Sequence, residues 1–172
     1  MSEEIGLRAL EKEDLPFIHK LNNNVEIMSY WFEEAYKTMT ELETSFEKDI
    51  SNPHQRQFIL NKGSERLGLV ELVSIDYMNR KAEFTIMMDP AHQGNGYAGI
   101  ATRLAVDYAF NIFNLHKLYL IVDEVNEKAI HIYKKIGFHE EATLKEEYFV
   151  NGSYHNIVIM SMFEDDYKAL DK

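Results

Sequence analysis

The residues that most directly suggest chemistry are three glycines, Gly94, Gly96 and Gly99. They lie between an apolar run that ends at Met88 and a helical pattern that begins near Gly96. A strand that turns through glycines into a helix start exposes backbone N–H groups at the positive end of the helix dipole, where phosphates bind. The alternative is a turn that needs glycines only for its conformation. The spacing matches neither a P-loop nor a GxGxxG dinucleotide fingerprint.

The order of residues in this loop is more specific than its glycine content. Gln93, Gly96 and Ala98 form the pattern Gln-x-x-Gly-x-Ala, which resembles a signature of the GCN5-related N-acetyltransferases, the GNAT superfamily. A later pattern, Asn-x-x-Ala-x-x-x-Tyr-x-x-x-Gly-Phe, resembles a second signature of that family and is formed by Asn126, Ala129, Tyr133, Gly137 and Phe138. The two motifs stand in the family's order, and the resemblance covers essentially the whole chain.

The resemblance implies a site for acetyl-coenzyme A. Backbone N–H groups of residues 86–88 would hold the thioester carbonyl and the pantetheine arm, and residues 93–99 would hold the pyrophosphate. Asn126 has an alternative role as a helix N-cap. The residues predicted to bind the coenzyme are Ile86, Met87, Met88, Gln93, Gly94, Asn95, Gly96, Tyr97, Ala98, Gly99, Asn126, Lys128 and Ala129.

Acyl transfer from a thioester to an amine requires an acid for the leaving thiolate and a base for the amine. A phenol with a pKa near ~10 can protonate a thiolate whose pKa is ~8.5. Tyr133 occupies the matching family position and is the predicted general acid; the alternative is a buried tyrosine packed one turn from Ala129. Glu83 is the predicted base, acting through water, and its alternative is a solvent-facing charge at a strand edge.

The segment 33–49 contains six acidic residues and two lysines. A solvated helix face explains such a run in many proteins. However, the segments 21–24, 29–34, 68–72 and 114–117 resemble the bacterial spermidine/spermine N-acetyltransferases, which favours a polyamine substrate. The predicted substrate-binding residues are Met28, Glu33, Glu34, Glu41, Asp49, Glu83, Phe84 and Thr85. Two other functions stay open: acetylation of protein N-termini, and a polyamine sensor without turnover.

By the same resemblance, we expect a cytoplasmic homo-oligomer, a dodecamer, with a second polyamine at a regulatory site between subunits. The aromatic segment Tyr30-Trp31-Phe32 is expected to be exposed and to anchor a subunit contact. Glu33 is the one predicted metal ligand. Because Ser74 replaces a carboxylate that would complete the site, we expect weak or absent Mg²⁺ binding.

The composition narrows the possible partners. The chain has 18 basic and 29 acidic residues and a formal net charge of −11. This balance disfavours nucleic acids and anionic membranes as partners and favours cationic ones. The absence of cysteine excludes an acyl-cysteine intermediate. No apolar run has the length of a membrane span, and residues 1–4 do not resemble the start of a signal peptide.

The elements that would position these residues alternate along the chain. A capping-box pattern at Thr40 and Glu43 predicts a helix with Leu42, Phe46 and Ile50 inward. We expect one α/β domain over residues 1–172, with a GNAT fold whose mixed, largely antiparallel central sheet is flanked by helices. The predicted strands are 5–10, 57–60, 67–75, 81–88, 117–122, 139–150 and 156–163, and the predicted helices are 14–22, 40–50, 96–113 and 126–137.

Overall fold

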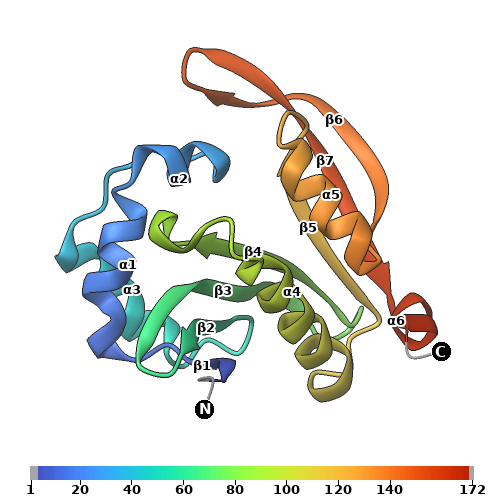
Figure 1. The fold of residues 1–172 in the computed structure, drawn as a ribbon, viewed down its shortest axis with the longest axis horizontal. Helices are drawn as coiled ribbons and strands as arrows, with labels where there is room; N and C mark the ends of the chain where they lie inside the picture. The colour runs from blue at the N-terminus through green and yellow to red at the C-terminus, as the bar shows by residue number, and fades with distance from the viewer. Residues whose placement is uncertain (1–3, 171–172) are drawn as a thin grey trace.

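A seven-stranded sheet organises the computed structural model, which describes residues 4–170 (Figure 1). The β4–β5 pair is parallel and every other neighbouring pair is antiparallel, which confirms the predicted mixed, largely antiparallel sheet. In spatial order the strands are β1 (Ile5–Ala9), β2 (Arg56–Lys62), β3 (Glu65–Asp76), β4 (Lys81–Met88), β5 (Lys117–Asp123), β7 (Ser153–Phe163) and β6 (His139–Val150).

Helices cover both faces of the sheet. Successive strand residues point to opposite faces. Leu69 of β3 accordingly packs with the first three helices, whereas Val70 packs in the core that contains α4 and α5 residues. No helix among residues 4–170 is long and apolar enough to cross a membrane. The helices are α1 (Leu15–Asn22), α2 (Val25–Tyr30), α3 (Met39–Asp49), α4 (Tyr97–Asp107), α5 (Glu127–Ile136) and α6 (Glu164–Leu170).

Four details differ from the sequence prediction. Helix α2 was not expected, and the capping box of α3 is formed by Thr38 and Glu41 rather than by Thr40 and Glu43. Ile50 follows the last residue of α3 and is exposed, so its predicted inward position is wrong. A π-helical turn over residues 108–112 follows α4 within the predicted helix 96–113, and its last residue, Ile112, is exposed.

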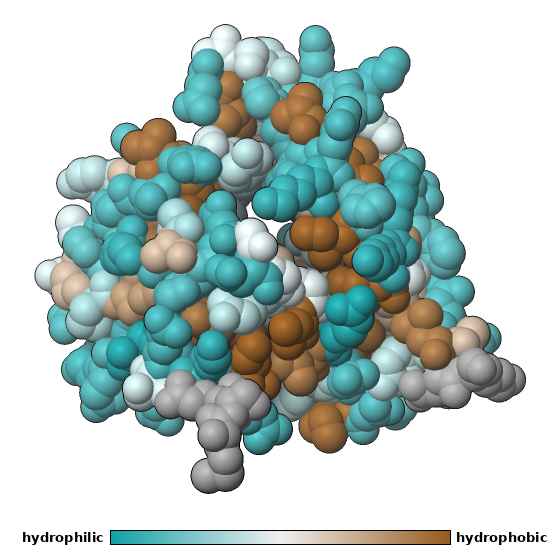
Figure 2. Space-filling model, in the orientation of Figure 1, coloured by the Kyte–Doolittle hydropathy of each residue, from teal (hydrophilic) through white to brown (hydrophobic). Residues whose placement is uncertain are grey.

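The parallel strands β4 and β5 separate soon after they begin. They pair only over residues 81–83 and 117–119, although β4 continues to Met88 and β5 to Asp123. The two strands diverge in Figure 1, and the space-filling view shows a hollow near the centre of the same face (Figure 2). The unpaired ends of β4 and β5 therefore border an opening in the sheet.

Candidate functional site

The glycine loop lies at the end of β4 and leads directly into α4. Gly96 is the N-cap residue of α4 and has φ 78°, and Gly94 has φ 82°. Both angles fall in the left-handed region that favours glycine. A Cβ atom added at either position would meet no heavy atom within 4 Å. The loop therefore places the amide end of α4 beside open space, which suits a bound phosphate.

The edge of β4 beyond Glu83 offers a second set of backbone groups. Strand β3 pairs with one edge of this segment, and within residues 4–170 the edge toward β5 has no strand partner. The indole Nε1 of Trp31 donates a hydrogen bond to the carbonyl oxygen of Ile86 over 3.3 Å. Peptide groups on a free strand edge can pair with an extended ligand that carries amides. The pantetheine arm of coenzyme A is such a ligand, so residues 86–88 fit their predicted role.

Tyr133 lies on α5 with its ring against the sheet. The ring packs edge-on against Phe84 and Phe138, with ring centroids 6.2 Å and 6.0 Å apart. Burial raises the pKa of the Tyr133 hydroxyl to about 12. Within residues 4–170 no hydrogen bond from this hydroxyl is seen, so its proton is available to a ligand. The arrangement suits a general acid that stays protonated at neutral pH.

Glu83 lies on β4 opposite Tyr119 of β5, at the last pair before the strands separate. Burial raises the pKa of the Glu83 carboxyl, and the charge of Glu71 raises it further. Burial also raises the pKa of the Tyr119 hydroxyl, with a smaller contribution from Glu83. A carboxylate with a raised pKa is a stronger base than an exposed one, which fits the predicted role of Glu83.

Glu71 is a buried carboxyl on the same side of the sheet. It accepts hydrogen bonds from Gln57 Nε2 at 2.7 Å and from Thr85 Oγ1 at 2.9 Å. Burial raises its pKa, and the charges of Asp49 and Glu33 act in the same direction. The negative charges of Glu33 and Asp49 thus act on Glu71 from a distance, and the charge of Glu71 acts on Glu83.

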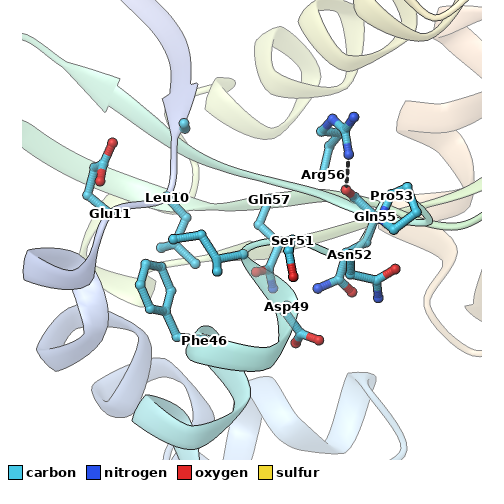
Figure 3. Close-up of a pocket in the computed structure, with 12 residues that line it drawn as sticks. Leu10, Glu11, Phe46, Asp49, Ser51, Asn52, Pro53, Gln55, Arg56 and Gln57 are labelled. Carbon is cyan, nitrogen blue, oxygen red and sulfur yellow. Dashed lines mark hydrogen bonds between the residues drawn. The ribbon is translucent and has the colours of Figure 1, made fainter.

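The other predicted substrate residues do not meet at one site. Glu33 and Glu34 line a cavity of about 470 Å³ beside the β6–β7 turn. Asp49 lines a separate cavity of about 450 Å³ near the end of α3, and Phe46 of the same helix also lines it (Figure 3). The Glu41 carboxylate accepts a hydrogen bond from the Thr38 amide at 2.8 Å, as the N3 residue of the capping box.

Two predicted substrate contacts lie in the core. Met28 and Phe84 each have 2% of their surface exposed. Met28 packs among residues of α1, α3 and the sheet, and Phe84 packs beneath Tyr133. Met28 belongs to the hydrophobic core beneath the first three helices, and Phe84 belongs to the core that contains residues of α4 and α5. Both residues therefore pack behind the site.

The coenzyme residues on α5 have simpler positions. Asn126 Oδ1 accepts a hydrogen bond from the Ala129 amide at 3.2 Å, so the predicted N-cap role is confirmed. Lys128 is exposed on the first turn of α5. Coenzyme contacts of these residues stay predictions. Within residues 4–170 no group of three or more histidine, aspartate and glutamate side chains has metal-binding geometry.

Sequence reasoning missed Glu71 and Tyr119. Glu71 is the single charged residue in the apolar run 67–73, a signal that could have found it. The interpretation of Tyr30-Trp31-Phe32 as an exposed anchor is wrong for two of its members. Trp31 turns inward to Ile86, and Phe32 stacks on Tyr148 of β6 with ring centroids 4.4 Å apart. Only Tyr30 is largely exposed.

Comparison with known proteins gives a consistent result. Residues 4–139 match the model of the acetyltransferase (GNAT) domain. Spermidine N(1)-acetyltransferase of Escherichia coli K12 is 47% identical over 171 residues, which are 99% of this chain and 92% of that protein.

Two solved structures from Vibrio cholerae are also similar. Spermidine N-acetyltransferase in complex with CoA and spermine has 47% identity and a TM-score of 0.94, with 95% of this chain and 98% of that chain covered. A dodecameric structure of that enzyme in an intermediate state has 46% identity and a TM-score of 0.88, with 98% of each chain covered. Since the family model covers most of the chain and the similarity to these relatives extends over nearly all of it, the protein belongs to the GNAT acetyltransferase family.

Proposed function

We propose that this protein transfers the acetyl group of acetyl-coenzyme A directly to a primary amine of a polyamine, spermidine or spermine. The observation that carries the proposal is the placement of Glu83 and Tyr133 on opposite faces of β4, beside the opening between β4 and β5. A base on one side and an acid on the other suit a reaction in which the amine and the leaving thiolate lie on different sides of one carbonyl group.

The residues divide the reaction between them. The ionised Glu83 carboxylate accepts a proton from the attacking amine, directly or through water. Backbone N–H groups of residues 86–88 stabilise the negative charge that develops on the carbonyl oxygen. The new C–N bond forms, the C–S bond breaks, and Tyr133 gives its proton to the departing thiolate. Glu83 then releases the amine's proton to solvent and the Tyr133 phenolate regains one from solvent, so both residues return to their starting states.

The electrostatics of the acceptor side favour a polycation. A polyamine amine has a pKa near ~10.4 and is mostly protonated at neutral pH. The combined negative charge of Glu33, Asp49, Glu71 and Glu83 would attract the charged amines, and Glu83 would remove the proton from the reacting one. The similarity to enzymes named for spermidine and to a spermine complex supports the same substrate class.

A substrate panel tests this proposal. Purified protein is assayed with acetyl-coenzyme A and spermidine, spermine, a diamine or a peptide with a free N-terminus. We expect turnover of the polyamines to exceed that of the peptide. Preferred acetylation of the peptide would instead support a protein N-terminal acetyltransferase. Polyamine binding without any acetylation would support a sensor.

We also infer that the chain forms a homo-oligomer, with the dodecamer of its V. cholerae relative as the expected size, and works in the cytoplasm. Exposed apolar side chains at Val25, Tyr30 and Tyr36 offer contact surface near α2. Light scattering with and without spermine tests the assembly, and a monomer under both conditions would contradict it.

A further inference from the structure

A serine, a histidine and an aspartate form a continuous hydrogen-bonded chain at the base of the β6–β7 turn. His155 Nδ1 lies 2.5 Å from Asp123 Oδ2, and His155 Nε2 lies 3.1 Å from Ser153 Oγ. The Asp123 carboxylate is buried, whereas Ser153 is exposed. Ser153 and His155 belong to β7, and Asp123 is the last residue of β5. None of the three belongs to the acetyl-transfer site described above.

The Asp123 carboxylate fixes the direction of one hydrogen bond, and the direction of the other follows when the His155 ring is neutral. An ionised carboxylate only accepts hydrogen bonds, so the proton between Asp123 and His155 must be on Nδ1. In the neutral ring Nε2 then carries no proton and accepts one from the Ser153 hydroxyl. The second oxygen of Asp123 accepts from the Val125 amide at 3.1 Å, which holds the carboxylate in place. This is the arrangement in which a serine hydroxyl becomes a nucleophile.

A purely structural role accounts for only part of this network. Asp123 and His155 alone would attach the β6–β7 turn to the end of β5. The Ser153 hydroxyl has another acceptor, the Val150 carbonyl, but at 3.4 Å that oxygen is farther away than His155 Nε2. The closer contact connects an exposed hydroxyl to an oriented base.

The surroundings provide space and further donors. Val150, which pairs with Ser153 across the turn, lines the cavity of about 470 Å³ that also contains Phe32. Asn151 and Gly152 form the turn with φ 49° and 88°. Within residues 4–170 the N–H groups of these two turn residues have no hydrogen-bond partner. They are the nearest free donors along the chain for the oxyanion of a tetrahedral intermediate.

We propose that Ser153, His155 and Asp123 form a second acyl-accepting centre that cleaves short-chain acyl esters. Ser153 Oγ attacks the ester carbonyl and passes its proton to His155 Nε2. The bond to the leaving alcohol breaks, and His155 returns the proton to that alcohol. Water, deprotonated by His155, then attacks the acyl-serine, and Ser153 regains its proton as the carboxylic acid leaves. The reaction uses only the ester and water.

Two probes test the centre in the full-length protein. A fluorophosphonate forms an Oγ–P bond with release of fluoride, and p-nitrophenyl acetate releases a coloured phenol. We expect one phosphonate adduct per chain, mapped by peptide mass spectrometry to Ser153. Ser153→Ala should abolish the adduct and lower the rate of ester cleavage about 100-fold or more, since general-base catalysis contributes ~10²–10⁴-fold. Asp123→Asn should lower it too, because the histidine tautomer is then no longer fixed.

The matched control is Ser64→Ala, which removes another exposed serine hydroxyl from a hairpin turn. This variant should react like the wild type with both probes. Thermal unfolding checks that each variant is folded, and Ser153→Ala alters only an exposed side chain. The proposal is overturned if the wild-type protein forms no adduct at Ser153, or if Ser153→Ala cleaves the ester at the wild-type rate.

Discussion

Glu83 and Tyr133 lie on opposite faces of strand β4. Tyr133 packs against Phe84, the residue next to Glu83, and neighbouring strand residues point to opposite faces. Glu83 instead shares its face with Thr85, which donates a hydrogen bond to Glu71. The strand thus separates an acidic side, with Glu71 and Glu83, from the side that carries Tyr133, and its free edge lies between them.

The first prediction concerns Tyr133. Tyr133→Phe should fold and bind acetyl-coenzyme A normally, because the ring contacts with Phe84 and Phe138 do not involve the hydroxyl. Its kcat should fall about 10²–10⁴-fold, since the proton donor to the thiolate is lost. Steady-state kinetics and coenzyme titration measure the two effects. Tyr36→Phe, which alters an exposed tyrosine, is the control. A wild-type kcat in Tyr133→Phe, with chemistry rate-limiting, would exclude the role.

The second prediction concerns Gly96. A β-branched residue is strained at φ 78°, so Gly96→Val should move the loop amides away from their phosphate-binding positions. We expect the KM for acetyl-coenzyme A to rise about 10- to 100-fold, because one or two charge-assisted hydrogen bonds to the phosphate are lost. The KM for the polyamine should change little. Gly6→Val is the control, because its surroundings are equally open and its φ is not positive. Equal changes in both KM values would place the coenzyme elsewhere.

The third prediction concerns pH. A base acts in its ionised form, so activity that depends on Glu83 is present above its raised pKa and is lost as the pH falls through that value. In a plot of kcat against pH, the midpoint of the acidic limb should therefore lie above the ordinary glutamate pKa of ~4.3. Glu71→Gln removes a charge that raises this pKa and should move the limb to lower pH. The control Glu43→Gln alters an exposed carboxylate of α3. An unmoved limb in Glu71→Gln would argue against Glu83 as the base.

The fourth prediction concerns stability. Asp14 is buried and forms ion pairs with Arg8 at 2.7 Å and Arg66 at 2.6 Å. The hydrogen bond from Arg8 is the largest cause that holds the pKa of Asp14 below its ordinary value. Because the folded-state pKa is depressed, this stabilisation is present above the unfolded pKa of ~3.9 and is lost as the pH falls below it.

Asp14→Asn should therefore lower the free energy of unfolding at pH 7 by about 2 kcal/mol. It should also weaken the acid sensitivity of the protein. Urea unfolding at pH 7 and at several acidic pH values measures both effects. Asp165→Asn, an exposed carboxylate of α6, serves as the control. Equal losses in the two variants would show that the ion pairs do not stabilise the fold.

The fifth prediction concerns regulation. Glu33 lines the cavity beside the β6–β7 turn and contributes to the acidic charge around Glu71. Glu33→Gln should flatten any sigmoidal dependence on polyamine concentration, whereas Glu26→Gln, an exposed residue of α2, should not. Calorimetry should show weak or absent Mg²⁺ binding to the free protein, since Mg²⁺ requires near-complete oxygen coordination. Tight Mg²⁺ binding, or unchanged cooperativity in Glu33→Gln, would contradict this view.

Local patterns predicted most of the fold. Strand β4 and helix α5 with its Asn126 cap lie where hydrophobic periodicity and capping residues placed them. The glycine motif correctly located the turn into α4, because left-handed angles there depend on local sequence. The capping box of α3 was misplaced since Thr38/Glu41 and Thr40/Glu43 have the same spacing, and only packing distinguishes them.

The candidate site was harder to predict, because strand register brings distant residues together. Glu83 meets Tyr119 only through the short β4–β5 pairing, and Asp123 meets His155 only through the β5–β7 pairing. Helix α2 places Trp31 beside Ile86, 55 positions away in the chain. Charge counting identified the acidic segment but could not show that Glu41 is a helix cap while Glu33 faces a cavity.

The early separation of β4 and β5 gives the sheet two internal edges in addition to its outer ones. Exposed strand edges generally invite other chains to add a strand, and this is a common origin of aggregation. Here the free edges of β4 and β5 border the same opening, and Trp31 occupies one carbonyl on it. The opening thereby leaves unpaired peptide groups accessible to a narrow ligand, whereas a strand of a second polypeptide has less access to them.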